Sequence, residues 1–201
     1  MDLKVLTIEQ MGLVRAQIVQ ALDILRSPGL SWAWQDADKE IDAKRDDIVN
    51  RSFDIMSLQQ PRPQDLRWIL GFQRIAQELE RVADYACDLG ELNALKLKGA
   101  WPPGIDEMGK HLLVMLDYCL DAVVKERDID HDMDDWDEPL DSLYNNLKQE
   151  LIHGPGPRDA ESGIVLILAR TLERMGDHVV NVGEMLLYIR TGHRHLKSVP
   201  S

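Results

Sequence analysis

The chain has 201 residues, of which 44% are apolar, and a formal net charge of −12 at pH 7. A chain of this length and composition buries enough apolar surface to fold by itself. The acidic balance argues against a nucleic-acid backbone as partner, because that binding draws mostly on Lys and Arg. It favours cations or basic protein surfaces instead.

The cysteines and the apolar runs indicate a soluble cytoplasmic protein. Cys87 and Cys119 are too few for a disulfide framework or a zinc site, so we expect buried free thiols in a reducing compartment. The N-terminus lacks a signal-peptide pattern, and the longest apolar run, Ile164–Ala169, is too short to span a bilayer. We therefore expect no direct membrane insertion.

Apolar residues at helical spacing predict an all-α protein with six helices and no strand. In chain order the predicted helices cover Met11–Leu25, Ile41–Leu58, Leu66–Leu97, Met108–Val124, Leu140–Ile152 and Ile164–Ile189. Clusters of proline and glycine separate them, because these residues end helices and supply turn geometry.

Two stretches that lie 93 residues apart carry nearly the same sequence, each inside a long predicted helix. The residues Leu79, Glu80, Arg81, Asp84, Gly90 and Glu91 recur as Leu172, Glu173, Arg174, Asp177, Gly183 and Glu184. Met11-Gly12 and Met108-Gly109 likewise open the first helix of each half. One duplication of a three-helix unit explains both matches. We predict two pseudo-repeated three-helix bundles, residues 1–100 and 101–201.

Pairs of acids spaced four apart accompany the repeat. Residues at this spacing lie on one face of a helix, so each pair can point two carboxylates the same way. The candidate metal ligands are Glu80, Asp84, Glu173 and Asp177 on the long helices, and Asp38, Asp42, Asp137 and Asp141 on the second helix of each half.

The acids of the long helices adjoin an apolar stripe, so we expect them at a partly buried seam. Crowded carboxylates repel one another there, and desolvation disfavours their charged forms unless a cation neutralises them. Oxygen ligands suit magnesium, calcium or manganese, and iron also tolerates carboxylates. Possible outer-shell residues are Arg81, Arg174, Asp88 and Asn181.

Two alternatives stay open from the residues alone. The acids can form a plain interaction module that meets basic partner surfaces without metal. A di-iron carboxylate enzyme would need Glu-x-x-His pairs on two helices, and Glu150 with His153 is the only such pair in the sequence.

Several segments resemble the PhoU family, whose members regulate phosphate uptake alongside the Pst transporter. The resemblance rests on Leu79–Asp84 and Leu172–Glu184, which look like the family's two signature helices. It extends to Gln59–Arg67 and Tyr188–Gly192, and so covers nearly the whole chain. Ala83 stands where the family usually has glycine, and Pro139 is a larger departure in the second half.

The resemblance implies a fold, a cofactor and a role. It implies two pseudo-symmetric three-helix bundles whose E/DxxxD motifs bind multinuclear iron or zinc. It also implies a non-enzymatic cytoplasmic protein, often a homodimer, that damps phosphate uptake and the starvation response. The implied partners are the phosphate ABC transporter and a sensor kinase.

Overall fold

The structure is a computed structural model that describes residues 2–26, 34–93, 101–130, 132–154 and 159–195. Over these ranges the chain forms six α-helices and no strand, which confirms the all-α prediction. The helices are α1 (Leu3–Arg26), α2 (Trp34–Gln59), α3 (Pro63–Asn93), α4 (Pro103–Val124), α5 (Met133–His153) and α6 (Ala160–Thr191).

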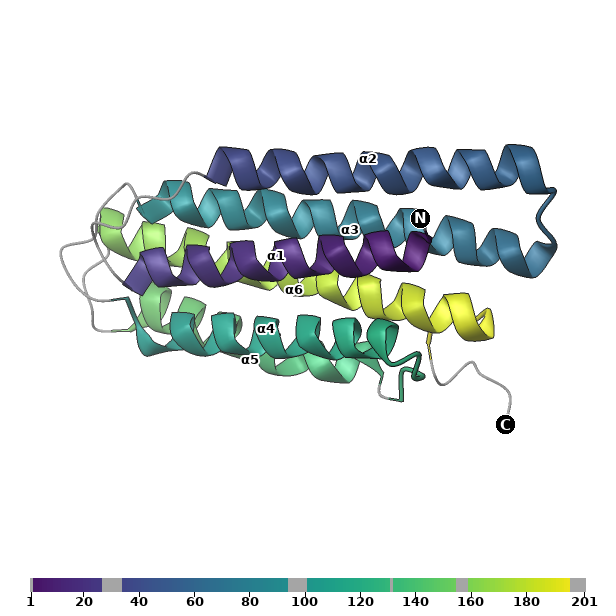
Figure 1. Cartoon of the computed structure of the whole chain (residues 1–201). Coiled ribbons are helices and arrows are strands. Elements are labelled where there is room, and N and C mark those ends of the chain that lie inside the picture. Colours follow the sequence, from purple (N-terminus) through teal and green to yellow (C-terminus); the bar gives the residue numbers. More distant parts are fainter. Residues whose placement is uncertain (1, 27–33, 94–100, 131, 155–158, 196–201) are drawn as a thin grey trace.

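The helices form an elongated bundle with the two long helices in its middle (Figure 1). In the first half α2 packs against α1 and α3, and in the second half α5 packs against α4 and α6. The halves meet through α3 against α6 and through α1 against α4. Each half is thus a three-helix unit, as the repeat predicts.

Both halves contribute to one continuous hydrophobic core. Met11 and Ile75 from the first half and Met115 and Leu172 from the second are fully buried in the same cluster. Because the apolar surfaces are shared, neither half presents a complete core of its own. The repeated units are therefore parts of one packed body.

Two buried glutamines fix the alignment of α1 against α3. Gln10 Nε2 donates to the carbonyl oxygen of Ala76 at 3.0 Å, and Gln17 Nε2 donates to that of Ala83 at 3.3 Å. Both the donors and the acceptors are seven residues apart, so the two hydrogen bonds lie about two turns apart along the contact between the helices. They join α1 to α3 inside the core.

All six helices begin earlier than the sequence pattern predicts, and α1, α2 and α5 do so by seven or eight residues. α1 begins at Leu3, where Leu3 and Leu6 are buried in the core. α5 begins at Met133 and continues through Pro139, where a break was expected. Met133 is buried, and the exposed ring of Pro139 leaves the turn before it intact. Packing of that turn offsets the hydrogen bond that a proline cannot donate.

A buried carboxylate joins α3 to α6. Glu78 is only 3% exposed, and its Oε1 lies 2.5 Å from an Arg74 guanidinium nitrogen. Its Oε2 lies 2.7 Å from His178 Nδ1 and accepts from Asn181 Nδ2 at 3.2 Å. Burial favours a higher pKa for Glu78, but the hydrogen bond from His178 and the charge of Arg74 hold the pKa below its usual value. This ionised group ties the halves together.

The contact between α5 and α6 is close at Gly176, and it yields a test of the packing. A side chain there would meet Leu140 and lie 3.0 Å from Asp137 Oδ1, whereas one at Gly163 of the same helix meets nothing within 4 Å. We expect Gly176→Val to lower the free energy of unfolding by about 2 kcal/mol, because overpacking forces the two helices apart. Chemical denaturation of both variants checks this, and equal effects of Gly176→Val and Gly163→Val would contradict the packing.

Candidate functional site

The first acid cluster comprises Asp38 and Asp42 of α2 and Glu80 and Asp84 of α3. The structure brings these side chains together between the two helices. Burial and the negative charges of the other three members raise the pKa of Asp84 to about 6, against an attraction from Arg81 that lowers it. The four carboxylates are therefore close enough to repel one another, as their spacing predicts.

A guanidinium group lies inside the first acid cluster. One terminal nitrogen of Arg45 is 3.0 Å from Asp42 Oδ1 and 2.6 Å from Glu80 Oε1, so it bridges α2 and α3. Its Nε and its other terminal nitrogen both donate to Asp46 Oδ1 at 3.1 Å. Arg45 thus neutralises part of the cluster with charge from the protein itself.

The second acid cluster comprises Asp137 and Asp141 of α5 and Glu173 and Asp177 of α6. Burial, followed by the charge of Asp177 and that of Asp141, raises the pKa of Glu173. Burial also raises the pKa of Asp177, with Asp141 adding to the shift and Arg174 opposing it. Asp137 reaches α6 beside Gly176, one residue before Asp177. The second half therefore repeats the carboxylate arrangement of the first.

Arg170 supplies the guanidinium of the second acid cluster. It donates a short hydrogen bond to Glu173 Oε1 from the same helix and lies over the ring of Tyr144, 5.5 Å from its centroid. Glu173 is only 7% exposed, and its Oε2 has no hydrogen-bond partner among the described residues. This cluster is therefore only partly neutralised.

The expected outer-shell residues do not form one shell. Arg81 and Arg174 lie near the clusters but make only long contacts, 3.7 Å to Asp84 and 3.9 Å to Asp177. Asp88 is largely exposed, and a partial loss of hydration together with the charge of Glu91 raises its pKa. Asn181 instead donates to Glu78 in the junction between α3 and α6. Only the two arginines are placed to influence the clusters.

The arrangement of the acidic side chains does not favour the expected metal site. Across the part of the chain that the structure describes, no three Asp, Glu, His or Cys side chains are grouped so as to hold a metal ion. In the first acid cluster, the oxygens that face one another across α2 and α3 are already bridged by Arg45. The residues in this arrangement fit a guanidinium rather than a metal cluster. Iron or zinc binding stays a prediction.

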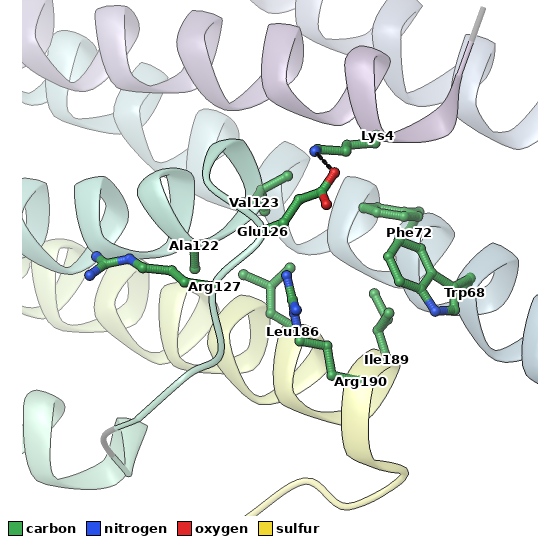
Figure 2. A pocket seen from close by; sticks show the side chains of 10 residues that line it. All are labelled: Lys4, Trp68, Phe72, Ala122, Val123, Glu126, Arg127, Leu186, Ile189 and Arg190. Carbon is green, nitrogen blue, oxygen red and sulfur yellow. Dashed lines mark hydrogen bonds and ion pairs between the residues drawn. The ribbon is translucent and has the colours of Figure 1, made fainter.

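Two further regions offer weaker sites. Glu150 and His153, the pair that a di-iron enzyme would use, are both exposed in the last turn of α5. At the other end of the bundle a small apolar pocket lies between α1, α3, α4 and α6 (Figure 2). Lys4 and Glu126 form an ion pair at its edge, which links the two halves. Half of its lining side chains belong to the core, namely Phe72, Ala122, Val123, Leu186 and Ile189.

Sequence reasoning missed the residues that neutralise the acids. Arg45 follows Asp42 by three positions, and Arg170 precedes Glu173 by three, a spacing at which helical side chains pair. That signal was present but common, so it did not single them out. Cys87, expected to be buried, is partly exposed beside the first acid cluster, with its Sγ 3.7 Å from Asp38 Oδ1. Cys119 is buried as expected.

The fold and its paired acid clusters define a class: a six-helix protein made of two three-helix repeats, each with carboxylates at one inter-helix seam. A family model described as the PhoU domain matches residues 8–92 and 105–186. The chain belongs to the PhoU family. Each match falls within one of the two predicted halves.

Relatives and solved structures agree with this assignment. The chain is 32% identical over 166 residues to a "Phosphate-specific transport system accessory protein PhoU homolog" of Synechocystis sp., covering 78% of this chain and 73% of the relative. It is 31% identical over 193 residues to the homolog of the same name in Caulobacter vibrioides, covering 90% and 83%. The crystal structure of PhoU from Pseudomonas aeruginosa superposes with a TM-score of 0.82 at 24% identity, covering 95% and 96% of the two chains. None of the described helices is long and apolar enough to cross a membrane.

The crowding of the first acid cluster predicts how stability depends on pH. The pKa of Asp84 is about 6 in the folded state, whereas an unperturbed aspartate has a pKa of 3.8. Its charged form therefore destabilises the fold above pH 6, and this cost is relieved as the pH falls. We expect Asp84→Asn to raise the melting temperature at pH 8 by about 1–3 °C, a modest value because the side chain is half exposed and screened by solvent.

Thermal unfolding in chelator at pH 8, 6 and 4.5 measures this effect. The advantage of Asp84→Asn should shrink below pH 6. Asp47→Asn, on the exposed surface of α2, serves as the control for loss of one negative charge. A destabilising effect of Asp84→Asn at pH 8 would show that the carboxylate is not crowded in the folded state.

Proposed function

We propose that this protein is a non-enzymatic, cytoplasmic regulator that damps uptake by a phosphate transporter and the phosphate-starvation response. The relatives' names describe accessory proteins of a phosphate-specific transport system, which supports a role beside the transporter. The main structural support for the proposal is the pair of acid clusters, because they are the chemically distinctive feature that both halves share.

The acid clusters suit contact with basic protein surfaces. Asp84 and Asp177 keep 47% and 41% of their side chains exposed, so a partner can reach them. Arg81 and Arg174 beside them are 63% and 49% exposed. Such charges mainly give specificity and fast association, which suits a regulator that binds and releases its partners. We propose the transporter's cytoplasmic components and a sensor kinase as those partners.

Metal binding is the finer part of this proposal. The resemblance implies iron or zinc at the E/DxxxD motifs, with manganese or magnesium as further candidates. The position of Arg45 between Asp42 and Glu80 favours the alternative in which the clusters act as a metal-free interaction surface. The proposed regulatory role is compatible with either form, because the relatives' names describe an accessory role without naming a metal.

A complementation experiment tests the role and the site together. Deleting the gene in its native host should raise expression of a phosphate-starvation reporter in phosphate-rich medium, and the wild-type gene should restore repression. We expect the double variant Asp84→Asn, Asp177→Asn to stay folded and to lose at least half of that repression, because it lacks the exposed charges that a partner contacts.

The matched control neutralises two exposed acids away from the clusters, Glu107→Gln with Glu150→Gln, and should repress fully. Immunoblots confirm equal protein levels. If the gene deletion leaves the reporter unchanged, the regulatory role is wrong. If the double variant represses as well as the wild type, the role stands and the acid clusters are not its contact surface.

A further inference from the structure

The guanidinium of Arg45 lies among the carboxylates of the first acid cluster. Arg45 comes from α2, is only 26% exposed in its side chain, and contacts Glu80, which is 18% exposed. Together with its contacts to Asp42 and Asp46, this gives one guanidinium three carboxylate partners. Such a charge-assisted arrangement is stronger than an ordinary surface pair, because the partners are partly removed from water.

In the second half a guanidinium also pairs with the glutamate of the repeat, but it comes from α6 instead of α5. The position on α5 equivalent to Arg45, taking the acid pairs Asp38/Asp42 and Asp137/Asp141 as the frame, holds Tyr144. The guanidinium comes instead from Arg170 on α6, where the equivalent position on α3 is Gln77. Tyr144 supports Arg170 with its ring face. Arg170 nevertheless binds Glu173, the counterpart of Glu80.

The arginine that contacts the glutamate of each repeat lies on the second helix in one half and on the third helix in the other. A duplication alone would leave both arginines at equivalent positions, or lose one of them without replacement. Here the arginine comes from a different helix in each half, whereas the glutamates that pair with it, Glu80 and Glu173, stand at equivalent positions. The constant element is a positive charge beside the glutamate of each repeat. The requirement is therefore for compensation of that carboxylate, not for an arginine at one position.

The second acid cluster also retains capacity for a further ligand. Glu173 is more than nine-tenths buried, and its Oε2 lacks a hydrogen-bond partner within the described residues while Oε1 is held by Arg170. A buried carboxylate oxygen without a donor is costly. The charges of Asp177 and Asp141 act on this carboxylate, but the described acids are not grouped so as to hold a metal ion, and Arg170 repels a cation from the same space.

We propose that Arg45 and Arg170 are built-in counter-ions of the two acid clusters, so that the residues of each cluster do not fit a divalent cation while the guanidinium is in place. Cation binding and the arginine–glutamate pair are thus mutually exclusive states of each cluster. The proposal concerns the clusters themselves and does not depend on the regulatory role proposed above.

Titration calorimetry with Mn²⁺ on the chelator-treated full chain tests this competition. We expect Arg45→Gln and Arg170→Gln each to bind Mn²⁺ at least about tenfold more tightly than the wild type, because each frees carboxylate oxygens that the guanidinium contacts directly. The matched controls are Arg81→Gln and Arg174→Gln. They change the net charge equally beside the same acids, but their guanidinium groups contact the acids only at 3.7 and 3.9 Å.

Arg45→Gln and Arg170→Gln binding Mn²⁺ no more tightly than the Arg81→Gln and Arg174→Gln controls would overturn the proposal. Unfolding in chelator gives a second readout, in which Arg45→Gln and Arg170→Gln should be less stable than the wild type and should regain stability on addition of Mn²⁺. If a glutamine variant does not fold in chelator, Arg45→Lys and Arg170→Lys keep the charge but lose the forked geometry. These should bind Mn²⁺ about two- to fivefold more tightly than the wild type, and no change would again overturn the proposal.

Discussion

Carboxylates at the seams between helices impose the constraint on which this structure depends. Each half places four acids where two helices meet, and burial, together with the charges of neighbouring acids, raises the pKa values of Asp84, Glu173 and Asp177. Groups crowded in this way favour separation of the helices unless positive charge holds them together. Arg45 supplies that charge across the first seam, whereas Arg170 pairs with Glu173 of its own helix and lies over the ring of Tyr144 of α5.

The rest of the fold keeps the two seams in a fixed relation. α3 and α6 carry the repeated motifs, and these same helices pack against each other at the centre of the molecule. Glu78 closes that junction with His178 and Asn181, and the hydrophobic core runs through both halves. A partner that contacts one acid cluster therefore meets the second cluster at a set distance. This arrangement suits a protein whose output is a contact rather than a reaction.

The sequence was sufficient for the repeat, the helices and the acid pairs, because each of these is a local pattern with a period. It was insufficient where tertiary packing decides. The first turns of α5 form ahead of Pro139 since Met133 is buried in the core, and no local signal reveals that burial. Asn181, equivalent to Asp88, bonds Glu78 across the junction instead of joining an acid cluster. Spacing shows which side chains share a face, but it does not show which group on the neighbouring helix fills the gap, and Arg45 and Arg170 were missed for this reason.

The energetic coupling between Arg45 and Glu80 tests this account most directly. A double-mutant cycle with Arg45→Gln, Glu80→Gln and the combined variant, measured by denaturant unfolding in chelator, isolates the pair from the rest of the structure. Charge compensation at the seam predicts a favourable coupling of about 1 kcal/mol or more, above the usual value for an exposed ion pair. A coupling indistinguishable from zero would show that the guanidinium does not hold the seam together.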